Sequence, residues 1–349
     1  MGTLAGQLAL QTQEAELFKP LDRGRVECFA CGHRCPISPG FAGICKVRFN
    51  RDGKLYAPYG YVNAAHCDPI EKKPFFHVLP GARAFSYGML GCDLHCGYCQ
   101  NWVSSQALRD PLSTLDFTAA TPEQLVDLAL RSGAAAIVGT YNEPLITAEW
   151  AVAIFRRAKA AGPVTGFVSN GNATPEVLDY IRPWVDLYKV DLKSFDDRHY
   201  HELGGRLGPI LDSLRRIHAM GFWLEVVTLV VPGFNDSDAE LRQIAEFLSG
   251  ISPDIPWHVT AFHKDYKMPG PAGTPPETLV RAAAAGRAAG LRYVYAGNLP
   301  GLGSLEDTHC PGCGAMLVER RSFRVLRNQL SAGACPHCGC AIPGIWSAP

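Results

Sequence analysis

The sequence predicts an α/β protein built around a parallel sheet, either a partial (β/α) barrel or an open doubly wound sheet. From residue 84 onward, six short apolar runs alternate with helix-like segments, the pattern of βαβ units. Thr-Pro-Glu at 121–123 and again at 174–176 marks two helix starts, because Thr is a good N-cap and Pro fits the first turn. In both architectures, chemistry lies at the carboxyl ends of the strands.

The expected elements follow in chain order. Residues 1–20 are polar and predict a helix or an arm, and Asp52-Gly53 predicts the turn of a β-hairpin over residues 48–61. Strands are predicted over residues 84–90, 136–141, 164–169, 184–190, 223–231 and 257–261, with a weaker seventh at 293–295. Besides the two helices that begin at Thr121 and Thr174, helices are predicted over 147–161, 209–220, 237–249 and 276–289.

The distribution of the 13 cysteines divides the chain into three parts. Eight cysteines lie between residues 28 and 99, five lie between 310 and 340, and none lies between 100 and 309. Clustered cysteines outside a disulfide framework are typical of metal ligands. We therefore expect an N-terminal Cys-rich metal-binding and hairpin segment (1–83), a partial barrel (84–305) and a zinc-ribbon-like C-terminal domain (306–349).

Composition excludes some classes of protein. The 33 Lys and Arg residues balance the 33 Asp and Glu residues. The chain therefore lacks the net positive charge that is typical of proteins that bind nucleic acids, and no nucleic-acid partner is expected. No apolar run reaches the ~18 residues of a membrane span. The first ten residues lack the basic and long apolar regions of a signal peptide, so we expect a cytoplasmic protein.

Three cysteines with the spacing C-x3-C-x2-C follow the first predicted barrel strand: Cys92, Cys96 and Cys99. Four-iron clusters usually take four cysteines, so three thiolates leave one iron open, as a catalytic metal site does. Tyr98 is placed to shield such a cluster. The alternatives are a zinc site, a cluster closed by a distant fourth cysteine, or three unrelated cysteines.

The triplet resembles the motif C-x3-C-x-aromatic-C of the radical S-adenosylmethionine (SAM) enzymes. Over residues 25–346 the chain resembles the radical SAM enzymes of the AmmeMemoRadiSam system, which are related to glycyl-radical-enzyme activases such as pyruvate formate-lyase activating enzyme. The segments that carry this resemblance are residues 68–74, 92–102, 141–144, 191–193, 231–236, 265–268 and 342–346. It implies a partial (β/α)6 radical SAM barrel and a [4Fe-4S] cluster that cleaves SAM reductively. The resulting 5′-deoxyadenosyl radical takes hydrogen from an unidentified substrate.

The resemblance also implies which residues hold SAM. Glu143 occupies the family's Gly-Gly-Glu-Pro position, with Tyr141-Asn142 replacing the glycines, and is expected at the SAM amino group. The other expected contacts are Ser169 and Asn170 with the ribose or methionine moiety, Lys193 with the carboxylate, Asp191 near a monovalent cation, and His263 beside SAM. The alternatives are a carboxylate at a helix N-terminus for Glu143, a surface ion pair for Asp191 and Lys193, and an ordinary polar residue for His263.

Two further cysteine sets predict metal sites. Cys28, Cys31, Cys35 and Cys45, with His33 as a substitute, predict structural zinc. An auxiliary iron–sulfur cluster is the alternative, which the nine-residue gap before Cys45 fits less well. Cys310, Cys313, Cys335 and Cys338 form two knuckles typical of a zinc ribbon or a rubredoxin, with zinc or iron as the ion. Cys67 and Cys340 belong to none of the predicted metal sites.

The substrate and partners stay open at this level. The substrate is a small molecule, a lipid or a protein, and guesses for its contacts are Asn101, Gln106, Tyr141, His258 and Lys267. The resemblance implies Memo-like and AMMECR-like partner proteins and an electron donor such as flavodoxin or ferredoxin. The alternative functions are a glycyl-radical-enzyme activase, which acts on a partner protein, and a non-catalytic zinc-ribbon binding protein.

Overall fold

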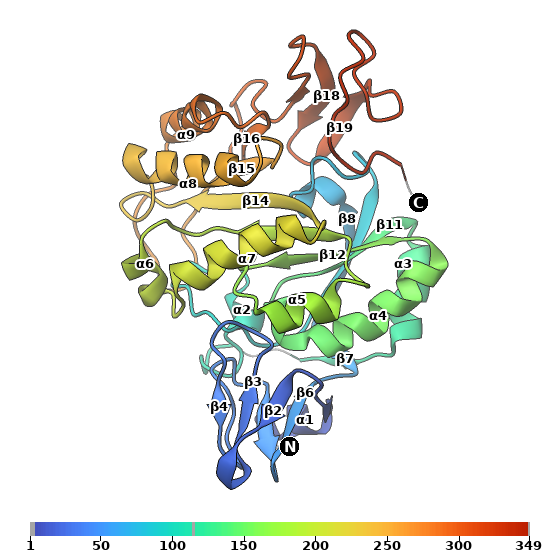
Figure 1. The fold of residues 1–349 in the computed structure, drawn as a ribbon, viewed down its shortest axis with the longest axis vertical. Helices are drawn as coiled ribbons and strands as arrows, with labels where there is room; N and C mark the ends of the chain where they lie inside the picture. The colour runs from blue at the N-terminus through green and yellow to red at the C-terminus, as the bar shows by residue number, and fades with distance from the viewer. Residues whose placement is uncertain (1–3, 114–115, 348–349) are drawn as a thin grey trace.

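A central sheet of eight strands organises the computed structural model, which describes residues 4–113 and 116–347 (Figure 1). The strand order is β16-β15-β14-β13-β12-β11-β9-β8, so β16 and β8 are the edge strands and the sheet is open. Seven strands are parallel: β9 (Arg83–Gly88), β11 (Ala134–Gly139), β12 (Val164–Ser169), β13 (Leu187–Asp191), β14 (Trp223–Val230), β15 (Trp257–Ala261) and β16 (Val294–Gly297). The predicted α/β class and the parallel sheet are confirmed.

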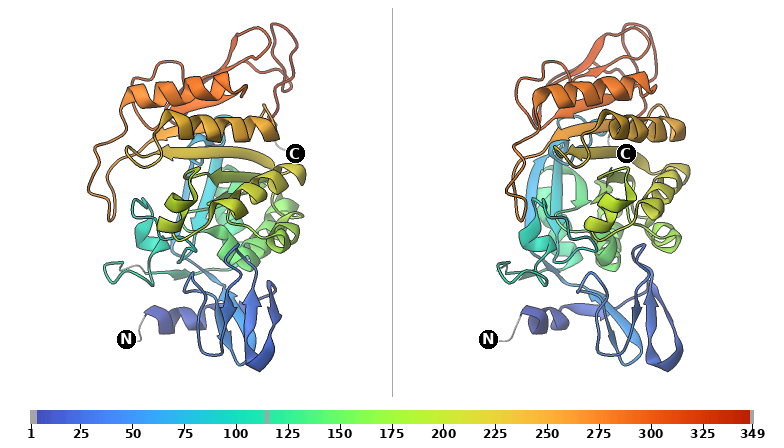
Figure 2. Two further views of the ribbon diagram at one scale, coloured as in Figure 1. Left: turned by 60° about the vertical axis from the view of Figure 1, so that its left-hand side comes forward. Right: turned by 90° about the vertical axis from the view of Figure 1, so that its left-hand side faces the viewer.

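Helices between successive strands cover the outer face of the sheet (Figures 1 and 2). They are α3 (Pro122–Arg131), α4 (Ala148–Ala161), α5 (Pro175–Ile181), α6 (Asp197–Glu202), α7 (Leu207–Ala219), α8 (Asp238–Ile251) and α9 (Pro276–Ala288). Thr121 and Thr174 are N-caps as predicted, since their side chains accept hydrogen bonds from the backbone N–H groups of Gln124 and Val177. The single turn η3 (Pro144–Thr147) precedes α4, and α2 (Trp102–Ser105) follows β9.

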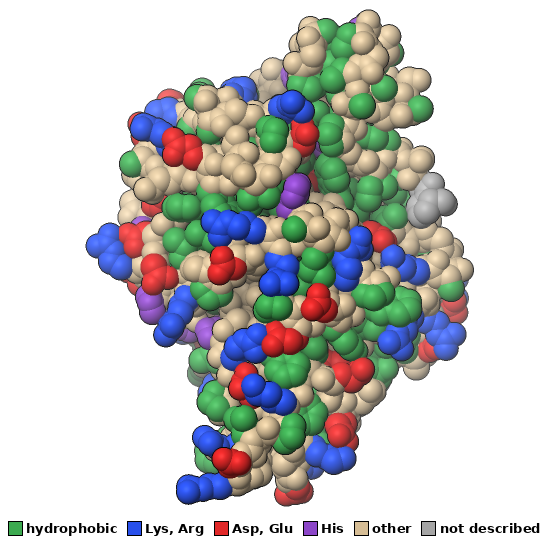
Figure 3. Space-filling model, in the orientation of Figure 1, with side chains coloured by type: hydrophobic (Ala, Val, Ile, Leu, Met, Phe, Trp, Pro, Cys, Tyr) green, Lys and Arg blue, Asp and Glu red, His purple; other side chains and the backbone are tan. Residues whose placement is uncertain are grey.

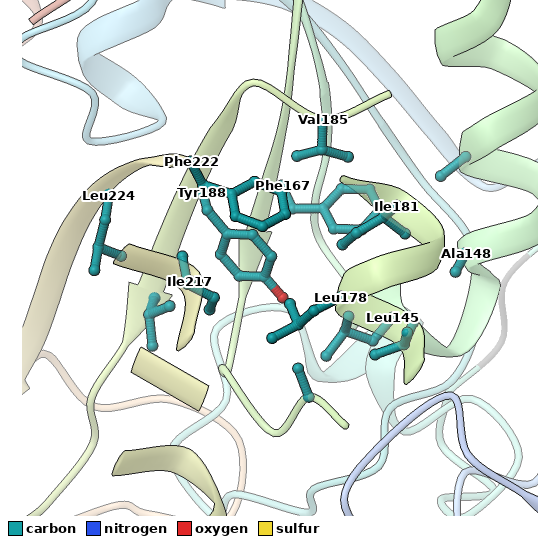
Figure 4. Close-up of a cluster of buried hydrophobic side chains, with 14 of the residues drawn as sticks. Leu145, Ala148, Phe167, Leu178, Ile181, Val185, Tyr188, Ile217, Phe222 and Leu224 are labelled. Carbon is teal, nitrogen blue, oxygen red and sulfur yellow. The ribbon is translucent and has the colours of Figure 1, made fainter. Parts of the chain in front are cut away.

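The outer core lies between the strands and these helices (Figure 4). Phe167 of β12 and Tyr188 of β13 pack there with Leu178 of α5 and Ile217 of α7, and all four side chains are fully buried. Each contributes about 1.5–3 kcal/mol by leaving water. Because side chains alternate along a strand, Lys189 faces the opposite side of β13, away from this core and into a cavity.

The N-terminal segment adds small sheets below the main sheet (Figure 1). It contains α1 (Leu4–Leu10), the sheet β1-β6-β5 (Thr12–Glu14, Lys54–Pro58, Phe49–Arg51) and the sheet β2-β3-β4 (Phe18–Pro20, Val26–Cys28, Pro36–Ile37). The predicted hairpin is confirmed, with Arg51 opposite Lys54 across the Asp52-Gly53 turn. β7 (Tyr61–Val62) pairs with β10 (Thr118–Ala119), and η1 (Asp22–Gly24) precedes β3.

One strand before residue 83 belongs to the main sheet. β8 (Ala64–Pro69) pairs antiparallel with β9, with Cys67 opposite Phe85. The short turn η2 (Ile70–Lys72) and an extended segment then connect β8 to β9. The sequence predicts that residues 1–83 form a separate N-terminal segment. Through β8, this segment instead contributes an edge strand to the central sheet.

The C-terminal segment forms a three-stranded antiparallel sheet against the other edge: β17 (Thr308–His309), β18 (Met316–Arg321) and β19 (Arg324–Asn328). Arg320 is 0% exposed and donates hydrogen bonds to Phe76 O and Thr308 Oγ1, each at 2.7 Å. Farther along, Leu79 N donates to Ile345 O and Ile345 N donates to His77 O. The tail is thereby joined to the segment between β8 and β9.

Charges are interspersed on the face shown in Figure 3, where Lys and Arg alternate with Asp and Glu over the helices. This agrees with the formal net charge of zero. Among the helices formed by residues 4–113 and 116–347, none has the length and apolar character needed to cross a membrane.

Candidate active site

The loop that follows β9, residues 89–101, carries Cys92, Cys96 and Cys99, and we call it the three-cysteine loop. Cys96 is 7% exposed, and all three thiols are free of disulfides. Local hydrogen bonds hold the loop: Leu94 N donates to Cys92 Sγ at 3.4 Å, and Cys99 N donates to Cys96 O at 3.2 Å. The loop therefore holds the three thiols at the carboxyl end of the first parallel strand, with Cys96 buried and Cys92 and Cys99 partly buried.

Cys96, Tyr98 and Cys99 line a cavity of about 430 Å³, which is within the size range of small-molecule sites. Its wall takes residues from five successive strands: Val168, Lys189, Val227, His258 and Tyr295. The sheet therefore curves around the cavity as a partial barrel. Residues of the tail, including Glu306 and Phe323, line it as well.

A row of charged side chains on β13 and its continuation faces this cavity. Lys189, Asp191 and Lys193 all line it, as expected from their alternate positions along the strand. Lys189 Nζ forms an ion pair with Asp191 Oδ1, and Lys193 Nζ lies 3.4 Å from Asp191 Oδ2. Burial favours the neutral carboxyl, but the two lysines outweigh it and hold the pKa of Asp191 below its ordinary value.

Tyr98 supplies an unpaired polar atom. Its ring is 3% exposed and lines the cavity, and its hydroxyl has no hydrogen-bond partner among the described residues. A buried hydroxyl without a partner costs about 1–3 kcal/mol. The Tyr98 side chain therefore forms part of the cavity wall, with its hydroxyl buried behind the surface.

Glu143 lies behind the cavity lining. Its carboxylate accepts hydrogen bonds from Ser169 Oγ and Asn170 N at 2.7 Å each and from Leu145 N at 3.1 Å. Burial, with the nearby charge of Asp93, raises the pKa of Glu143 to about 8. The structure thus brings together three of the predicted SAM contacts, Glu143, Ser169 and Asn170, in one hydrogen-bonded group.

Asp93 connects this group to the three-cysteine loop. It is 0% exposed and accepts hydrogen bonds from Asn170 Nδ2 at 2.7 Å and from Asn172 Nδ2 at 2.8 Å. Asn170 Nδ2 also lies 4.0 Å from Cys92 Sγ. The predicted contacts Glu143, Ser169 and Asn170 are therefore next to Cys92, whereas Asp191 and Lys193 are on the side of Cys96 and Cys99.

Besides Cys92, Glu143, Ser169 and Asn170, three more residues named from the sequence are not part of the cavity lining. His263 is exposed, with Nδ1 3.4 Å from Lys264 O. Gln106 bonds to Leu94 O at 3.2 Å, and Lys267 pairs with Asp110 at 3.0 Å. Of the substrate contacts guessed from the sequence, Asn101, Tyr141 and His258 do line the cavity.

Sequence reasoning missed several buried charged groups. Lys73 is 4% exposed and places Nζ 3.1 Å from Asp68 Oδ2 and 3.2 Å from Tyr141 Oη. Glu225 accepts a 2.7 Å hydrogen bond from His258 Nε2 beside the cavity. Lys189 could have been predicted from the sequence, because it lies two residues before Asp191 and therefore on the same face of the strand. For Asp93, the only indication in the sequence is its position next to Cys92.

The four tail cysteines Cys310, Cys313, Cys335 and Cys338 gather as predicted. Within residues 4–113 and 116–347, they are the one group of three or more His, Cys, Asp or Glu side chains whose ligand atoms all lie within 4.8 Å of one another. Two of the sulfur pairs are 3.5 and 3.7 Å apart. Four sulfurs at this spacing suit one tetrahedral zinc or iron ion. Cys340 lies outside the group, as expected.

The N-terminal thiols lie against the three-cysteine loop. Cys28, Cys31 and Cys45 are buried, and Cys35 is partly buried. His33 Nε2 lies 3.1 Å from Asp93 O. Cys67 is apart from these thiols, with its sulfur 3.9 Å from Ser132 O.

Comparison with known proteins adds two findings. The sequence profile of the radical SAM superfamily matches residues 87–248, which extend from the end of β9 into α8. An uncharacterized protein of Methanocaldococcus jannaschii is 35% identical over 331 residues, which cover 94% of this chain and 98% of that protein.

Two activating enzymes are also similar over part of the chain. The benzylsuccinate synthase activating enzyme of Thauera aromatica is 35% identical over 129 residues, 32% of this chain and 39% of that enzyme. The pyruvate formate-lyase-activating enzyme of Staphylococcus epidermidis is 24% identical over 206 residues, 53% of this chain and 78% of that enzyme.

Proposed function

This chain belongs to the radical SAM superfamily and is homologous to activating enzymes, and from that premise we propose that it is a radical SAM enzyme acting on a substrate bound in the 430 Å³ cavity. The observation that carries the proposal is that Cys96 and Cys99 line the same cavity as Asp191 and Lys193. Metal-ligating thiols and a paired cation and carboxylate thus meet in one space of suitable size.

The residues fit the cofactors that the superfamily implies. The three thiols of the loop are not a one-ion group among the described residues, and wider spacing is what a cluster of several irons requires. When bound, the [4Fe-4S] cluster supplies the electron that cleaves SAM into methionine and a 5′-deoxyadenosyl radical, which takes hydrogen from the substrate. Cys92, Cys96 and Cys99 would hold this cluster.

The chain's own residues bind and orient the cofactor. Lys193 is the cation for the SAM carboxylate, because its ammonium lines the cavity and its pKa is raised: burial opposes the charge, but Asp191 outweighs it. The carboxylate of Glu143 serves the amino group through the site that it forms with Ser169 and Asn170. Tyr98 contributes its side chain to the cavity wall. We assign no contact to His263, which is exposed.

The far end of the cavity favours a small substrate. Glu306 and Phe323 of the tail line it. The tail therefore restricts the space through which a loop of a partner protein would have to enter the cavity. Lys73 and Lys189, each 4% exposed, put two ammonium groups at the lining.

The resemblance to the AmmeMemoRadiSam system supports Memo-like and AMMECR-like partners, a flavodoxin or ferredoxin as reductant and a cytoplasmic location.

A second candidate function is a glycyl-radical-enzyme activase. The similarity to two enzymes named as activating enzymes favours it. In that case the hydrogen is taken from a glycine of a partner protein. An electron paramagnetic resonance doublet on such a partner after incubation with this protein, SAM and reductant would establish it, whereas turnover of a small molecule without a partner would exclude it.

The proposed function has a direct test. Protein reconstituted anaerobically with iron and sulfide is incubated with SAM and dithionite, and 5′-deoxyadenosine and methionine are measured by mass spectrometry. Cys96→Ala should lower deoxyadenosine formation at least 100-fold, because one cluster ligand is lost. The matched control Cys67→Ala removes a thiol that lies apart from the site and should leave the rate within twofold. Cluster-loaded wild-type protein that makes no deoxyadenosine contradicts the proposal.

A further inference from the structure

The two outlying cysteine sets differ in the spacing of their sulfur atoms. A zinc ion with Zn–S bonds of about 2.3 Å in tetrahedral geometry puts its sulfurs about 3.8 Å apart. The tail set meets this condition, with sulfur pairs at 3.5 and 3.7 Å. The N-terminal set can therefore be compared with the tail set, whose four thiols have the spacing suited to one ion.

The N-terminal set does not meet the condition. Cys28 N donates to Cys35 O at 3.0 Å, and Ile44 N, beside Cys45, donates to Cys35 Sγ at 3.4 Å, so the backbone brings these thiols into one neighbourhood. Yet among the described residues no three of these thiols, with or without His33, lie mutually within 4.8 Å. The N-terminal thiols therefore lack the mutual spacing with which the tail set suits a single ion.

The set also lies directly on the three-cysteine loop. His33 Nε2 is 3.1 Å from Asp93 O. Gly32 N donates to Asn172 O at 2.8 Å, and the Asn172 side chain in turn donates to Asp93. A Cβ atom on Gly91 would stand 3.1 Å from Cys45 O. Backbone contact on both sides of Cys92 therefore joins the N-terminal thiols to the loop.

A buried ion pair and a hydrogen bond to sulfur lie next to the N-terminal set. Arg48, three residues after Cys45, is 1% exposed and pairs with Glu149 through two contacts of 2.7 Å. Ile44 N donates a hydrogen bond to Cys35 Sγ at 3.4 Å. Net charge, hydrogen bonds to sulfur and exclusion of solvent set the reduction potential of iron–sulfur clusters.

We propose that Cys28, Cys31, Cys35 and Cys45 hold an iron–sulfur cluster of several irons, in place of the structural zinc that their sequence spacing favours. The cluster accepts one electron from a one-electron reductant, a reduced flavin or iron–sulfur protein or dithionite. It returns to its oxidised state when that electron moves to the centre on the three-cysteine loop. Its presence is independent of the proposed function, but the second transfer rests on it.

The test removes the loop's ligands and leaves the N-terminal set intact. The variant Cys92→Ala/Cys96→Ala/Cys99→Ala is reconstituted anaerobically with iron, sulfide and an equal amount of zinc. We expect two or four acid-labile sulfides per chain, and an electron paramagnetic resonance signal after reduction with dithionite. Acid-labile sulfide is diagnostic, because a single iron in the tail contributes none. A variant with no sulfide and two zinc ions per chain overturns the proposal.

A second variant assigns the cluster to these cysteines. Adding Cys31→Ser and Cys45→Ser to the triple variant should remove the sulfide, whereas adding Cys67→Ser and Cys340→Ser should not. If the added serines prevent folding, wild-type protein gives the same answer, since its sulfide content should exceed that of the Cys31→Ser/Cys45→Ser protein and of the triple variant alike. Sulfide that persists without Cys31 and Cys45 overturns the assignment. Deoxyadenosine formation by the wild type is measured separately, so zinc in the N-terminal site with normal activity refutes this inference alone.

Discussion

At the scale of single residues, Gly91 controls how closely the three-cysteine loop approaches the N-terminal segment. Its φ of +95° lies in a region that side chains other than glycine rarely adopt. A Cβ there would stand 2.8 Å from Val47 Cγ1 and 3.1 Å from Cys45 O. Both the backbone conformation and the contact exclude a side chain at this position.

Gly91→Ala should therefore lower the free energy of unfolding by about 2–3 kcal/mol and reduce iron uptake. Gly97→Ala is the matched control in the same loop, since no atom lies within 4 Å of the added Cβ. It should change stability by less than about 1 kcal/mol. Urea denaturation of the reconstituted proteins and iron analysis measure both effects. Equal losses in the two variants would refute the role given to Gly91.

His77 predicts a pH dependence of stability. Burial lowers its pKa from 6.5 to about 4, and its Nδ1 donates to Pro343 O at 2.7 Å. The unfolded chain therefore binds a proton at this residue below pH 6.5 while the folded chain does not until about pH 4, so acidification destabilises the fold. Between pH 7.5 and 5.5 this residue should cost about 1.3 kcal/mol.

The comparison of wild type with His77→Gln isolates this contribution. The variant should be less stable at pH 7.5, because the histidine's hydrogen bonds to Pro343 and Tyr295 are altered. Its urea midpoint should fall less steeply toward pH 5.5. Parallel pH profiles for the two proteins would show that His77 does not titrate on unfolding.

Sequence patterns find residues whose spacing is imposed by chemistry, and miss those placed by the fold. Cys92, Cys96 and Cys99 can be found because one cluster needs them close together in the chain. Asp93 and Glu225 cannot, since Asp93 meets Asn172 across 79 positions and Glu225 meets His258 across 33. Only the packed structure shows that these carboxylates are buried and paired.

At the scale of elements, strands with apolar runs were predictable and the edge strand was not. β11 to β15 are mostly buried along their length and rich in apolar residues, although β13 and β14 also carry charged side chains. β8 is half-exposed along its length and contains His66 and Asp68, so its sequence resembles the turn-rich segment before it. The Asp52-Gly53 hairpin could be predicted because its turn demands those residue types.

We expect the tail sheet to depend on a metal ion bound by its four cysteines. Cys313→Ser/Cys338→Ser should release one metal ion per chain and make residues 306–347 susceptible to proteolysis, while leaving the three-cysteine loop able to take up iron. Cys340→Ser is the matched control, because Cys340 lies outside the four-sulfur group. Metal analysis and limited proteolysis with mass spectrometry distinguish the two. Release of metal by the Cys340 variant would mean that the ligand set is wrong.

At the scale of the whole molecule, Arg320 joins the tail to the barrel. Its guanidinium is 0% exposed, bonds to Phe76 O and Thr308 Oγ1, and lies 4.3 Å from the centre of the Phe76 ring. It also lies 4.0 Å from the buried carboxylate of Glu71. Without Arg320, buried acceptors on both sides of the interface lose their donor.

Arg320→Ala should lower the free energy of unfolding by about 3–5 kcal/mol, measured by urea denaturation. Arg327→Ala removes an exposed arginine of the neighbouring strand β19 and should cost less than about 0.5 kcal/mol. If the two variants unfold at the same urea concentration, the tail is not held to the barrel by this side chain.

The attachment of the tail has a consequence for biosynthesis. Val78 forms a β-bridge with Ile345, and Phe323 and Glu306 line the cavity. On the ribosome, all the thiols up to Cys99 emerge long before residue 345 does. The cysteines of the loop are therefore synthesised before the tail residues that complete the cavity wall.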